Sequence, residues 1–287
     1  MSSFSDLTFR DAVRDDVPGI AALRATEGWG VHEWALGAVI GRPNARCVVA
    51  IGREGEMAGV GSGIVYGALG FIGNMIVAEG HRRRGVGSAI LTAVTDYLEA
   101  SGCRRLELNA TATGRPLYER HGFASRGHSA TGLLRRGIVA APDASVATRV
   151  ATTDDLPSVA SYDRPRFGGN RAELLEMLLS MPSTTMVLAE RDSRLVGFAW
   201  IRPEDPRIGP MVAEDPAVAA SLLVEAFRIA AGLEHVRLNL PPGNRPGAAW
   251  LESLGVEIEP WDGRMARGEE IERREETIYA MAVGALG

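Results

Sequence analysis

The stretch Arg82-Arg83-Arg84-Gly85-Val86-Gly87 decides how the first half of this 287-residue chain is interpreted. It stands between an apolar, β-branched run, Phe71–Val77, and a segment with one apolar helical face, Ser88–Ala100. Glycines let a backbone approach a ligand closely, and the free amides at a helix N-terminus attract phosphate. Arginine side chains add charge-assisted hydrogen bonds to phosphate oxygens. The pattern predicts a strand, a loop that binds pyrophosphate, and a helix.

Two better-known phosphate loops do not match this stretch. A P-loop needs lysine followed by serine or threonine, and a dinucleotide loop needs G-x-G-x-x-G after the first strand. Neither pattern is present. An arginine cluster can also be a solvated surface, so the flanking sequence has to decide between the two interpretations.

The flanking segments alternate between expected strands and expected helices. Asp15-Asp16 before Val17-Pro18 predicts a helix start, and Gly102 predicts the end of the helix after the loop. The other expected elements are strands at Leu7–Val13, Cys47–Ile51, Val60–Tyr66 and Leu106–Asn109, and helices at Val17–Ala25, Trp29–Ile40 and Pro116–Arg120. The sequence therefore predicts a mixed α/β (α+β) architecture.

The chain contains an internal repeat. Three short stretches of the first half return in the same order: Arg10–Pro18 as Arg149–Pro157, Ile72–Met75 as Ile208–Met211, and Leu108-Asn109 as Leu238-Asn239. Collinear matches at similar spacing indicate a duplicated domain, and the long period excludes a solenoid. We expect two domains, 1–138 and 146–287, joined by a linker within Gly137–Ser145.

The loop resembles the coenzyme A loop of the GCN5-related N-acetyltransferase (GNAT) family, Q/R-x-x-G-x-G/A, at Arg82, Gly85 and Gly87. A second family motif, Leu-Tyr-Glu-x-x-Gly-Phe, is matched downstream by Leu117–Phe123. The sequence departs from the family at Arg83, where glycine is common. The resemblance implies two GNAT-like mixed-sheet domains in tandem, with acetyl-CoA as cosubstrate.

The resemblance also implies roles for individual residues. The main chain of Met75, Ile76 and Val77 would pair with the pantetheine arm of the cofactor. Tyr118 would lie near the coenzyme sulfur and protonate the departing thiolate, although a packed helix tyrosine is the alternative. The residues expected to bind pyrophosphate are Arg82, Arg83, Arg84, Gly85, Val86, Gly87 and Ser88.

In this family the region between the first helices lines the acceptor site, which here contains Glu27, Trp29, His32 and Glu33. The attacking amine must lose a proton, and Glu27 is our first candidate for the base. Asn74 stands near where some members place a catalytic carboxylate; an amide is no base, so a water relay is the other possibility. Solvent exposure of the two glutamates and core packing of Trp29 are the structural alternatives.

The second half lacks both motifs. The stretch after Met211, Val212–Ala220, contains no arginine and no glycine pair, and its Glu214 and Asp215 would repel phosphate. The counterpart of the second motif reads Trp250-Leu251-Glu252-Ser253-Leu254-Gly255-Val256, without the tyrosine. We expect a degenerate domain that shapes the acceptor site or an oligomer contact, in a monomer or homodimer.

Composition excludes several classes of protein. With 46% hydrophobic and 23% charged residues, the sequence is typical of a globular protein, and a net charge of -5 offers no broad basic surface for nucleic acid. The two cysteines, Cys47 and Cys103, show no metal-ligand spacing, so no metal site is expected. No apolar run is long enough to span a bilayer, which favours a cytoplasmic protein without a membrane partner.

The predicted function is acyl-CoA-dependent N-acetylation. The expected acceptor is a small-molecule amine, for example a cationic amino sugar such as an aminoglycoside, because an acidic protein mildly favours a cation. The alternatives are acetylation of a protein or peptide amine, and a non-catalytic sensor that binds acyl-CoA.

Overall fold

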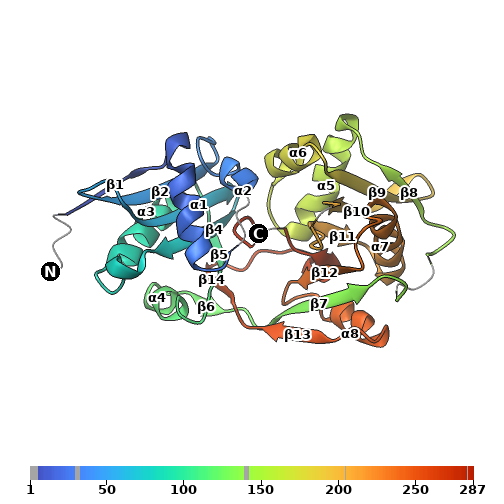
Figure 1. Cartoon of the computed structure of the whole chain (residues 1–287). Coiled ribbons are helices and arrows are strands. Elements are labelled where there is room, and N and C mark those ends of the chain that lie inside the picture. Colours follow the sequence, from blue (N-terminus) through green and yellow to red (C-terminus); the bar gives the residue numbers. More distant parts are fainter. Residues whose placement is uncertain (1–5, 30–32, 139–141, 204, 283) are drawn as a thin grey trace. The chain divides into compact units, whose positions relative to one another are not determined.

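The computed structural model describes residues 6–29, 33–138, 142–203, 205–282 and 284–287, and these form two compact units (Figure 1). Unit 1 comprises Met1–Ala124, Met265–Ile271 and Gly284–Gly287, and unit 2 comprises Ser125–Arg264 and Glu272–Val283. Both units are mixed α/β, as expected. The expected domains were continuous stretches, whereas each unit takes segments from both halves of the chain.

Unit 1 is built on a seven-stranded sheet of order β1-β2-β3-β4-β5-β14-β6. Strands β1 to β4 pair antiparallel, and β4 pairs parallel with β5. The apolar side of the long helix α3 packs on this sheet. The elements are β1 (Leu7–Asp11), α1 (Val17–Thr26), α2 (Glu33–Gly37), β2 (Ala45–Gly52), β3 (Met57–Tyr66), β4 (Leu69–Val77), α3 (Val86–Ala100), β5 (Arg105–Asn109), α4 (Arg115–Arg120), β6 (Ala124–Ser125) and β14 (Arg264–Gly268).

The second expected helix is much shorter than predicted. Trp29–Ile40 was expected to be helical, but α2 covers only Glu33–Gly37, and residues 30–32 lie outside the described part of the chain. Turns follow Gly37 up to Gly41, whose φ of 72° favours glycine. Two glycines within five residues explain why the apolar pattern does not continue as a helix.

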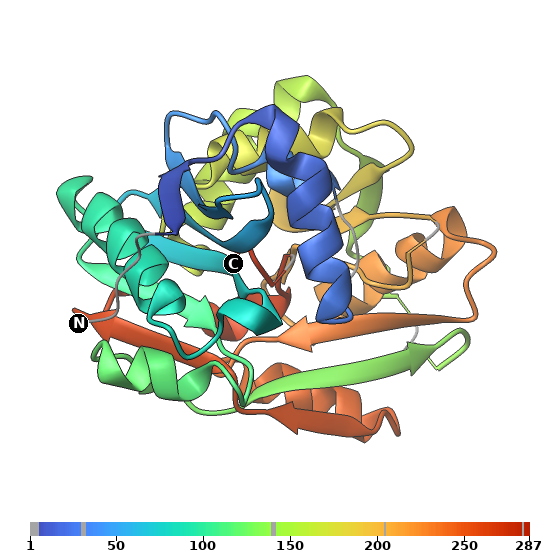
Figure 2. The same cartoon turned by 60° about the vertical axis from the view of Figure 1, so that its left-hand side comes forward.

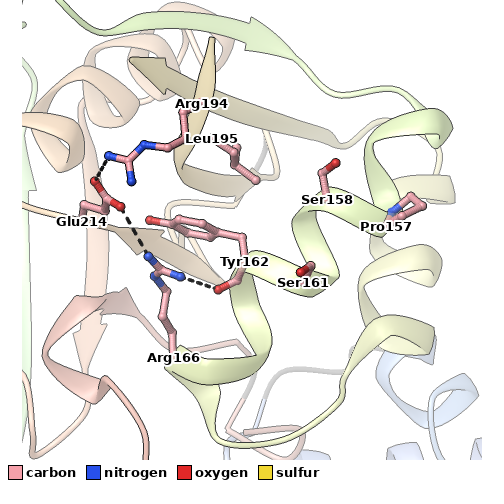
Figure 3. Close-up of a pocket in the computed structure, with 8 residues that line it drawn as sticks. All are labelled: Pro157, Ser158, Ser161, Tyr162, Arg166, Arg194, Leu195 and Glu214. Carbon is pink, nitrogen blue, oxygen red and sulfur yellow. Dashed lines mark hydrogen bonds and ion pairs between the residues drawn. The ribbon is translucent and has the colours of Figure 1, made fainter. Parts of the chain in front are cut away.

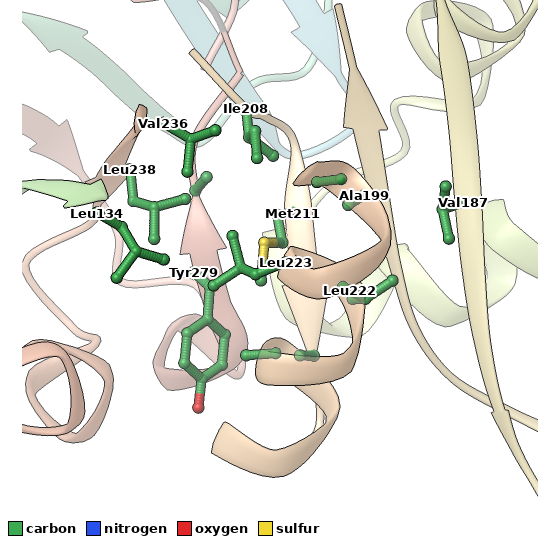
Figure 4. Packing of buried hydrophobic residues seen from close by; sticks show 14 of the residues in the cluster. Leu134, Val187, Ala199, Ile208, Met211, Leu222, Leu223, Val236, Leu238 and Tyr279 are labelled. Carbon is green, nitrogen blue, oxygen red and sulfur yellow. The ribbon is translucent and has the colours of Figure 1, made fainter. Parts of the chain in front are cut away.

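Unit 2 contains a five-stranded sheet, β15-β11-β10-β9-β8, and a three-stranded sheet, β12-β7-β13. One apolar cluster, which includes Met211, Leu222, Leu238 and Tyr279, forms its core (Figure 4). The elements are β7 (Ser129–Arg135), β8 (Ala147–Val150), α5 (Leu156–Phe167), α6 (Ala172–Ser180), β9 (Thr185–Arg191), β10 (Arg194–Ile201), β11 (Met211–Ala213), α7 (Pro216–Ile229), β12 (His235–Leu240), α8 (Arg245–Ser253), β13 (Ile258–Trp261) and β15 (Ile278–Ala280).

The repeated stretch at the start of each half has the same geometry in both. Arg10 donates to both carboxylate oxygens of Asp16 at 2.7 and 2.8 Å, and Arg149 donates to Asp155 at 2.8 and 2.7 Å. The N-cap residue before each short 3-10 helix has φ of -114° in both halves. The duplication inferred from the sequence is therefore visible in the structure.

Each half of the chain contributes one strand to a sheet built mainly from the other half. Strand β14 lies between β5 and β6, and β7 lies between β12 and β13. Figure 2 shows the green β7 running between orange strands of the C-terminal half. Leu134 of β7 is fully buried in the core of unit 2 (Figure 4). This exchange explains why the units are discontinuous in sequence.

Two negative findings apply to the part of the chain that the structure describes. No helix there has the length and apolar character needed to cross a membrane. Nor do His, Cys, Asp and Glu side chains gather there in a group that could hold a metal ion.

Candidate active site

The predicted phosphate loop leads directly into α3. Gly85 is the N-cap residue, with φ of 87°, and no side chain caps the helix. The amide groups of the first helical turn are therefore left for a ligand or for water. Val86 is buried in the core, which anchors the start of the helix, whereas Arg82 to Gly85 are exposed. Such a helix N-terminus suits a phosphate group.

Arg83 has a φ of 60°, in the left-handed region that favours glycine. The departure from the family pattern therefore places a strained arginine where glycine is common. We expect the free energy of unfolding of Arg83→Gly to be about 1 kcal/mol higher than that of Arg83→Ala, because only the alanine keeps a Cβ in this strained conformation. Urea unfolding measures this difference.

Titration with coenzyme A tests the charge of Arg83 separately. Both variants should lose affinity equally if the guanidinium binds phosphate. Equal unfolding free energies of the two variants would contradict the strain argument.

Strand β4 carries a bulge next to the loop. Asn74 and Met75 together stand opposite Gly61 of β3, and Asn74 has a φ of 54°. The parallel pairing of β4 with β5 ends at Ile72 and Leu108. Beyond that pair the two strands diverge, so Met75–Val77 does not pair with β5.

A pocket of about 520 Å³ lies at this divergence and extends to the loop. It brings together most of the residues predicted from the sequence: Glu27, Trp29, Met75, Ile76, Val77, Arg82, Arg83, Gly85, Gly87, Ser88 and Tyr118. Five predicted residues are not in its lining. Arg84 is exposed elsewhere on the loop, Val86 is core, and His32 and the side chain of Glu33 lie outside the described part of the chain. Asn74 is buried and does not line the pocket.

Asn74 is buried in a polar network instead of facing the pocket. Its Oδ1 accepts a hydrogen bond from Arg24 of α1, and its Nδ2 donates to Ser62 Oγ at 2.9 Å. Burial lowers the pKa of Arg24, whose guanidinium lies 5.9 Å from the centre of the Trp29 ring. The network ties α1 to the bulge of β4.

Glu27 forms an ion pair with Arg82. The Nε of Arg82 also donates to the carbonyl oxygen of Val77 at 2.9 Å. These contacts join the end of α1, the end of β4 and the phosphate loop. If a ligand phosphate paired with Arg82, the ion pair between Arg82 and Glu27 would break, and the Glu27 carboxylate would become available in the pocket.

Tyr118 reaches the pocket from α4, on the far side of the phosphate loop. Its side chain is 5% exposed and packs edge-to-face on Phe123, with ring centres 6.1 Å apart. Burial raises the pKa of the phenol well above its usual value. The hydroxyl therefore remains protonated, as a proton donor must.

Sequence reasoning missed the residues that line the pocket from the β5–α4 loop and α4: Thr111, Thr113, Gly114, Leu117 and Arg120, together with Glu79. It also missed a hydrogen bond of 2.6 Å between Ser88 Oγ and His121 Nε2. This bond joins the first turn of α3 to the end of α4. The position of α4 beside the loop is a tertiary feature, although the second motif already marked this helix.

The corresponding place in unit 2 is filled by the chain itself. The N-cap of α7 is Asp215, whose carboxylate accepts from the amide of Val218 at 2.9 Å. Strand β11, the counterpart of the end of β4 in unit 1, pairs with β15, and the amide of Met281 donates to Asn239 in β12 at 2.8 Å. In unit 2 a carboxylate thus caps the helix and a strand pairs with β11, whereas in unit 1 no side chain caps α3 and the end of β4 does not pair with β5.

Unit 2 has a polar pocket of about 510 Å³ beside α5 (Figure 3). Glu214 pairs with Arg194 at 3.2 Å and with Arg166 at 3.6 Å. The guanidinium of Arg166 lies 3.4 Å from the centre of the Tyr162 ring. Both arginines pair with the carboxylate of Glu214, and Arg166 also lies on the aromatic face of Tyr162, so these side chains of the pocket satisfy one another.

Comparison with known proteins follows the division into two halves. Residues 13–123 match the acetyltransferase (GNAT) family, and residues 159–280 match an acetyltransferase (GNAT) domain. YitH, an uncharacterized N-acetyltransferase of Bacillus subtilis, is 26% identical over 79% of each chain. A mycothiol acetyltransferase of Kineococcus radiotolerans is 30% identical over 69% of this chain and 73% of its own length.

Solved structures share the fold over nearly the whole length. A candidate acetyltransferase from Pyrococcus horikoshii superposes with a TM-score of 0.81 at 20% identity, covering 99% of this chain and 97% of its own. A tandem GNAT protein from the clavulanic acid biosynthesis pathway gives 0.63 at 14% identity, covering 92% and 98%. Members of this family generally use acetyl-CoA. The chain belongs to the GNAT family of acetyltransferases and carries two of its domains in tandem.

Proposed function

We propose that unit 1 transfers an acetyl group from acetyl-CoA to a primary amine of a small molecule. The observation that carries this proposal is the pocket where an uncapped helix N-terminus, the part of β4 that does not pair with β5, and Tyr118 meet. Each of these suits one part of acetyl-CoA: phosphate groups, amide groups of the pantetheine arm, and sulfur.

The fit of the cofactor follows the order of groups along the pocket. The amides of Arg83 to Ser88 would hold the pyrophosphate, with the charge of Arg82 and Arg83 nearby. The backbone of Met75–Val77 would pair with the pantetheine amides as a neighbouring strand does. The thioester then lies near Met75, at the end of the pocket farther from the loop.

The chemical step needs no covalent acyl-enzyme. The amine nitrogen attacks the thioester carbon, the carbon–sulfur bond breaks, and the sulfur takes a proton from the phenol of Tyr118. The amine loses its proton to Glu27 or to a water molecule, and solvent restores the phenol proton. Holding both reactants together supplies much of the rate enhancement.

Thiol release from acetyl-CoA, measured across a panel of amines, tests the proposal. Two curated relatives are named mycothiol acetyltransferases, so the panel includes the deacetylated amine form of mycothiol beside aminoglycosides, polyamines and peptides. We expect release above background with at least one small amine. Tight coenzyme A binding without release would favour the sensor, and release with peptides alone would favour a peptide acetyltransferase.

We expect Glu27→Gln to lower kcat about tenfold, because the glutamine cannot accept a proton and only a water chain would remain. The Kd of coenzyme A should change less than fivefold, since an ion pair this exposed is worth roughly 1 kcal/mol or less. Steady-state kinetics and calorimetric titration separate the two effects. A large loss of coenzyme A affinity with unchanged kcat would assign Glu27 to the loop instead of to proton transfer.

For unit 2 we propose a supporting role without cofactor. Asp215 satisfies the start of α7 and repels phosphate, and β15 takes the strand edge that a pantetheine arm needs. Calorimetry with coenzyme A should give one site per chain.

A further inference from the structure

The segment Gly284–Leu286 packs on three neighbouring strands of unit 1. Leu286 is fully buried, and its carbonyl oxygen accepts from Tyr66 Oη of β3 at 2.8 Å. The carbonyl oxygen of Gly284 accepts from Asn109 Nδ2 of β5 at 2.9 Å. Ala285 lies against Gly73 of β4, where a Cβ would stand only 2.3 Å from the Ala285 carbonyl oxygen.

These contacts lie where β4 and β5 begin to diverge. The last pair of the two strands is Ile72 with Leu108, and the next residue on each strand, Gly73 and Asn109, contacts the segment. The segment therefore crosses the sheet at the point where β4 and β5 begin to separate. Met75, the first residue of β4 that lines the pocket, is two positions beyond Gly73.

The segment lies on the face of the sheet opposite α3. A Cβ on Gly63 would stand 2.8 Å from Val94 of α3, so odd-numbered positions of this part of β3 point toward that helix. Because side chains alternate along a strand, Ser62 and Tyr66 point to the other face. Ser62 there bonds Asn74, which Arg24 of α1 also contacts. Helix α1 and the segment thus share one face.

In the proposed reaction an acceptor would approach the thioester from this face. The end of α1 supplies Glu27 and Trp29 to the pocket, and α3 and the phosphate loop occupy the opposite side. An amine bound near Met75 is then bounded by α1 on one side and by the segment at the inner end of the strands.

We propose that Gly284–Leu286 is the specificity-determining wall of the acceptor site, which admits compact primary amines and excludes bulky ones. The inference rests on the proposed function, since it concerns the acceptor of that same reaction. Because Gly73 has no side chain, the segment can lie close to β4, and its hydrogen bonds with Tyr66 and Asn109 hold it against the sheet.

Three variants displace the wall in different ways. Gly73→Ala pushes the segment away, Tyr66→Phe removes one anchor and adds no atom, and removal of residues 284–287 deletes the wall. Gly232→Ala is the matched control, because a Cβ there meets no atom within 4 Å and its φ is not left-handed. Each variant is assayed with ethanolamine and with kanamycin as the small and large amine.

We expect Gly73→Ala and the shortened chain to raise the ratio of kcat/KM for kanamycin over ethanolamine at least tenfold. Tyr66→Phe should raise the ratio about twofold, and Gly232→Ala should leave it unchanged. The Kd of coenzyme A should remain within twofold of the wild-type value in all four. An unchanged ratio, or a parallel loss of coenzyme A binding, would overturn the proposal.

A second readout needs no amine. Deleting the wall lets water reach the thioester, where its oxygen attacks the carbonyl carbon, the carbon–sulfur bond breaks, and acetate and the free thiol leave. We expect the shortened chain to hydrolyse acetyl-CoA at least threefold faster than the wild type; equal rates would count against the wall. If the wild-type protein acetylates neither these amines nor the wider panel, the proposed function fails, whereas the hydrolysis comparison still judges the wall.

Discussion

Replacing Tyr118 by phenylalanine should lower kcat about 100-fold, because loss of a general acid typically costs this much or more. The phenol lines the pocket from α4, and its burial keeps it protonated even in alkaline buffer. A thiolate that leaves without a proton is a poorer leaving group, so the chemical step slows while substrate binding does not. Steady-state kinetics with saturating acetyl-CoA measures the effect.

The phenylalanine ring preserves the packing that Tyr118 makes with Phe123, so the Kd of coenzyme A and the thermal unfolding midpoint should hardly change. Tyr97→Phe is the matched control, since Tyr97 of α3 is partly buried, does not line the pocket, and donates a long hydrogen bond to the carbonyl oxygen of Pro43 at 3.4 Å. If the turnover of Tyr118→Phe stays within twofold of the wild type, Tyr118 is not the proton donor and has a packing role only. The pH profile adds a further check, because a raised phenol pKa predicts no loss of rate from Tyr118 between pH 8 and about 10.

Where the chemistry is local, the sequence marked residues that the structure brings together in one pocket. The loop, the start of α3 and Tyr118 are each marked by residues within one strand–loop–helix unit or one short motif, and the pocket contains them. Asn74 shows the limit of such reasoning. Its place on β4 suggested the acceptor site, but a bulge turns its amide toward Arg24 and Ser62. A bulge changes the side-chain alternation, and no pattern in the sequence predicted this bulge.

The sequence alone could not predict that the two halves of the chain exchange strands. The repeat predicted two domains, and matching capping geometry at Asp16 and Asp155 confirms the duplication. The repeat could not show that β7 and β14 are exchanged, because a repeated pattern indicates strands but not which strands pair. Equally, nothing near Gly284 predicted its contact with Asn109. Partner choice between equivalent edges is set by tertiary packing, so periodicity alone does not decide it.

The contrast between the two helix N-termini gives a second large expected effect. In unit 2 Asp215 caps α7, whereas in unit 1 Gly85 leaves α3 uncapped. Gly85→Asp would place a carboxylate at the first turn of α3, beside the expected pyrophosphate. Two unit charges about 4 Å apart near a protein surface repel by roughly 4 kcal/mol before screening by salt. We expect the Kd of coenzyme A to rise about 100-fold.

Gly85→Asn separates this charge effect from backbone strain. Both side chains have nearly the same size, both can cap a helix, and both meet the same cost at a φ of 87°, a conformation that asparagine tolerates better than most residues. The asparagine variant should therefore lose much less affinity, and raising the salt concentration should narrow the gap between the two variants. Calorimetric titration with coenzyme A at two ionic strengths measures both quantities. If the aspartate and asparagine variants bind coenzyme A equally, phosphate does not lie at the α3 N-terminus, and the cofactor orientation proposed for unit 1 is wrong.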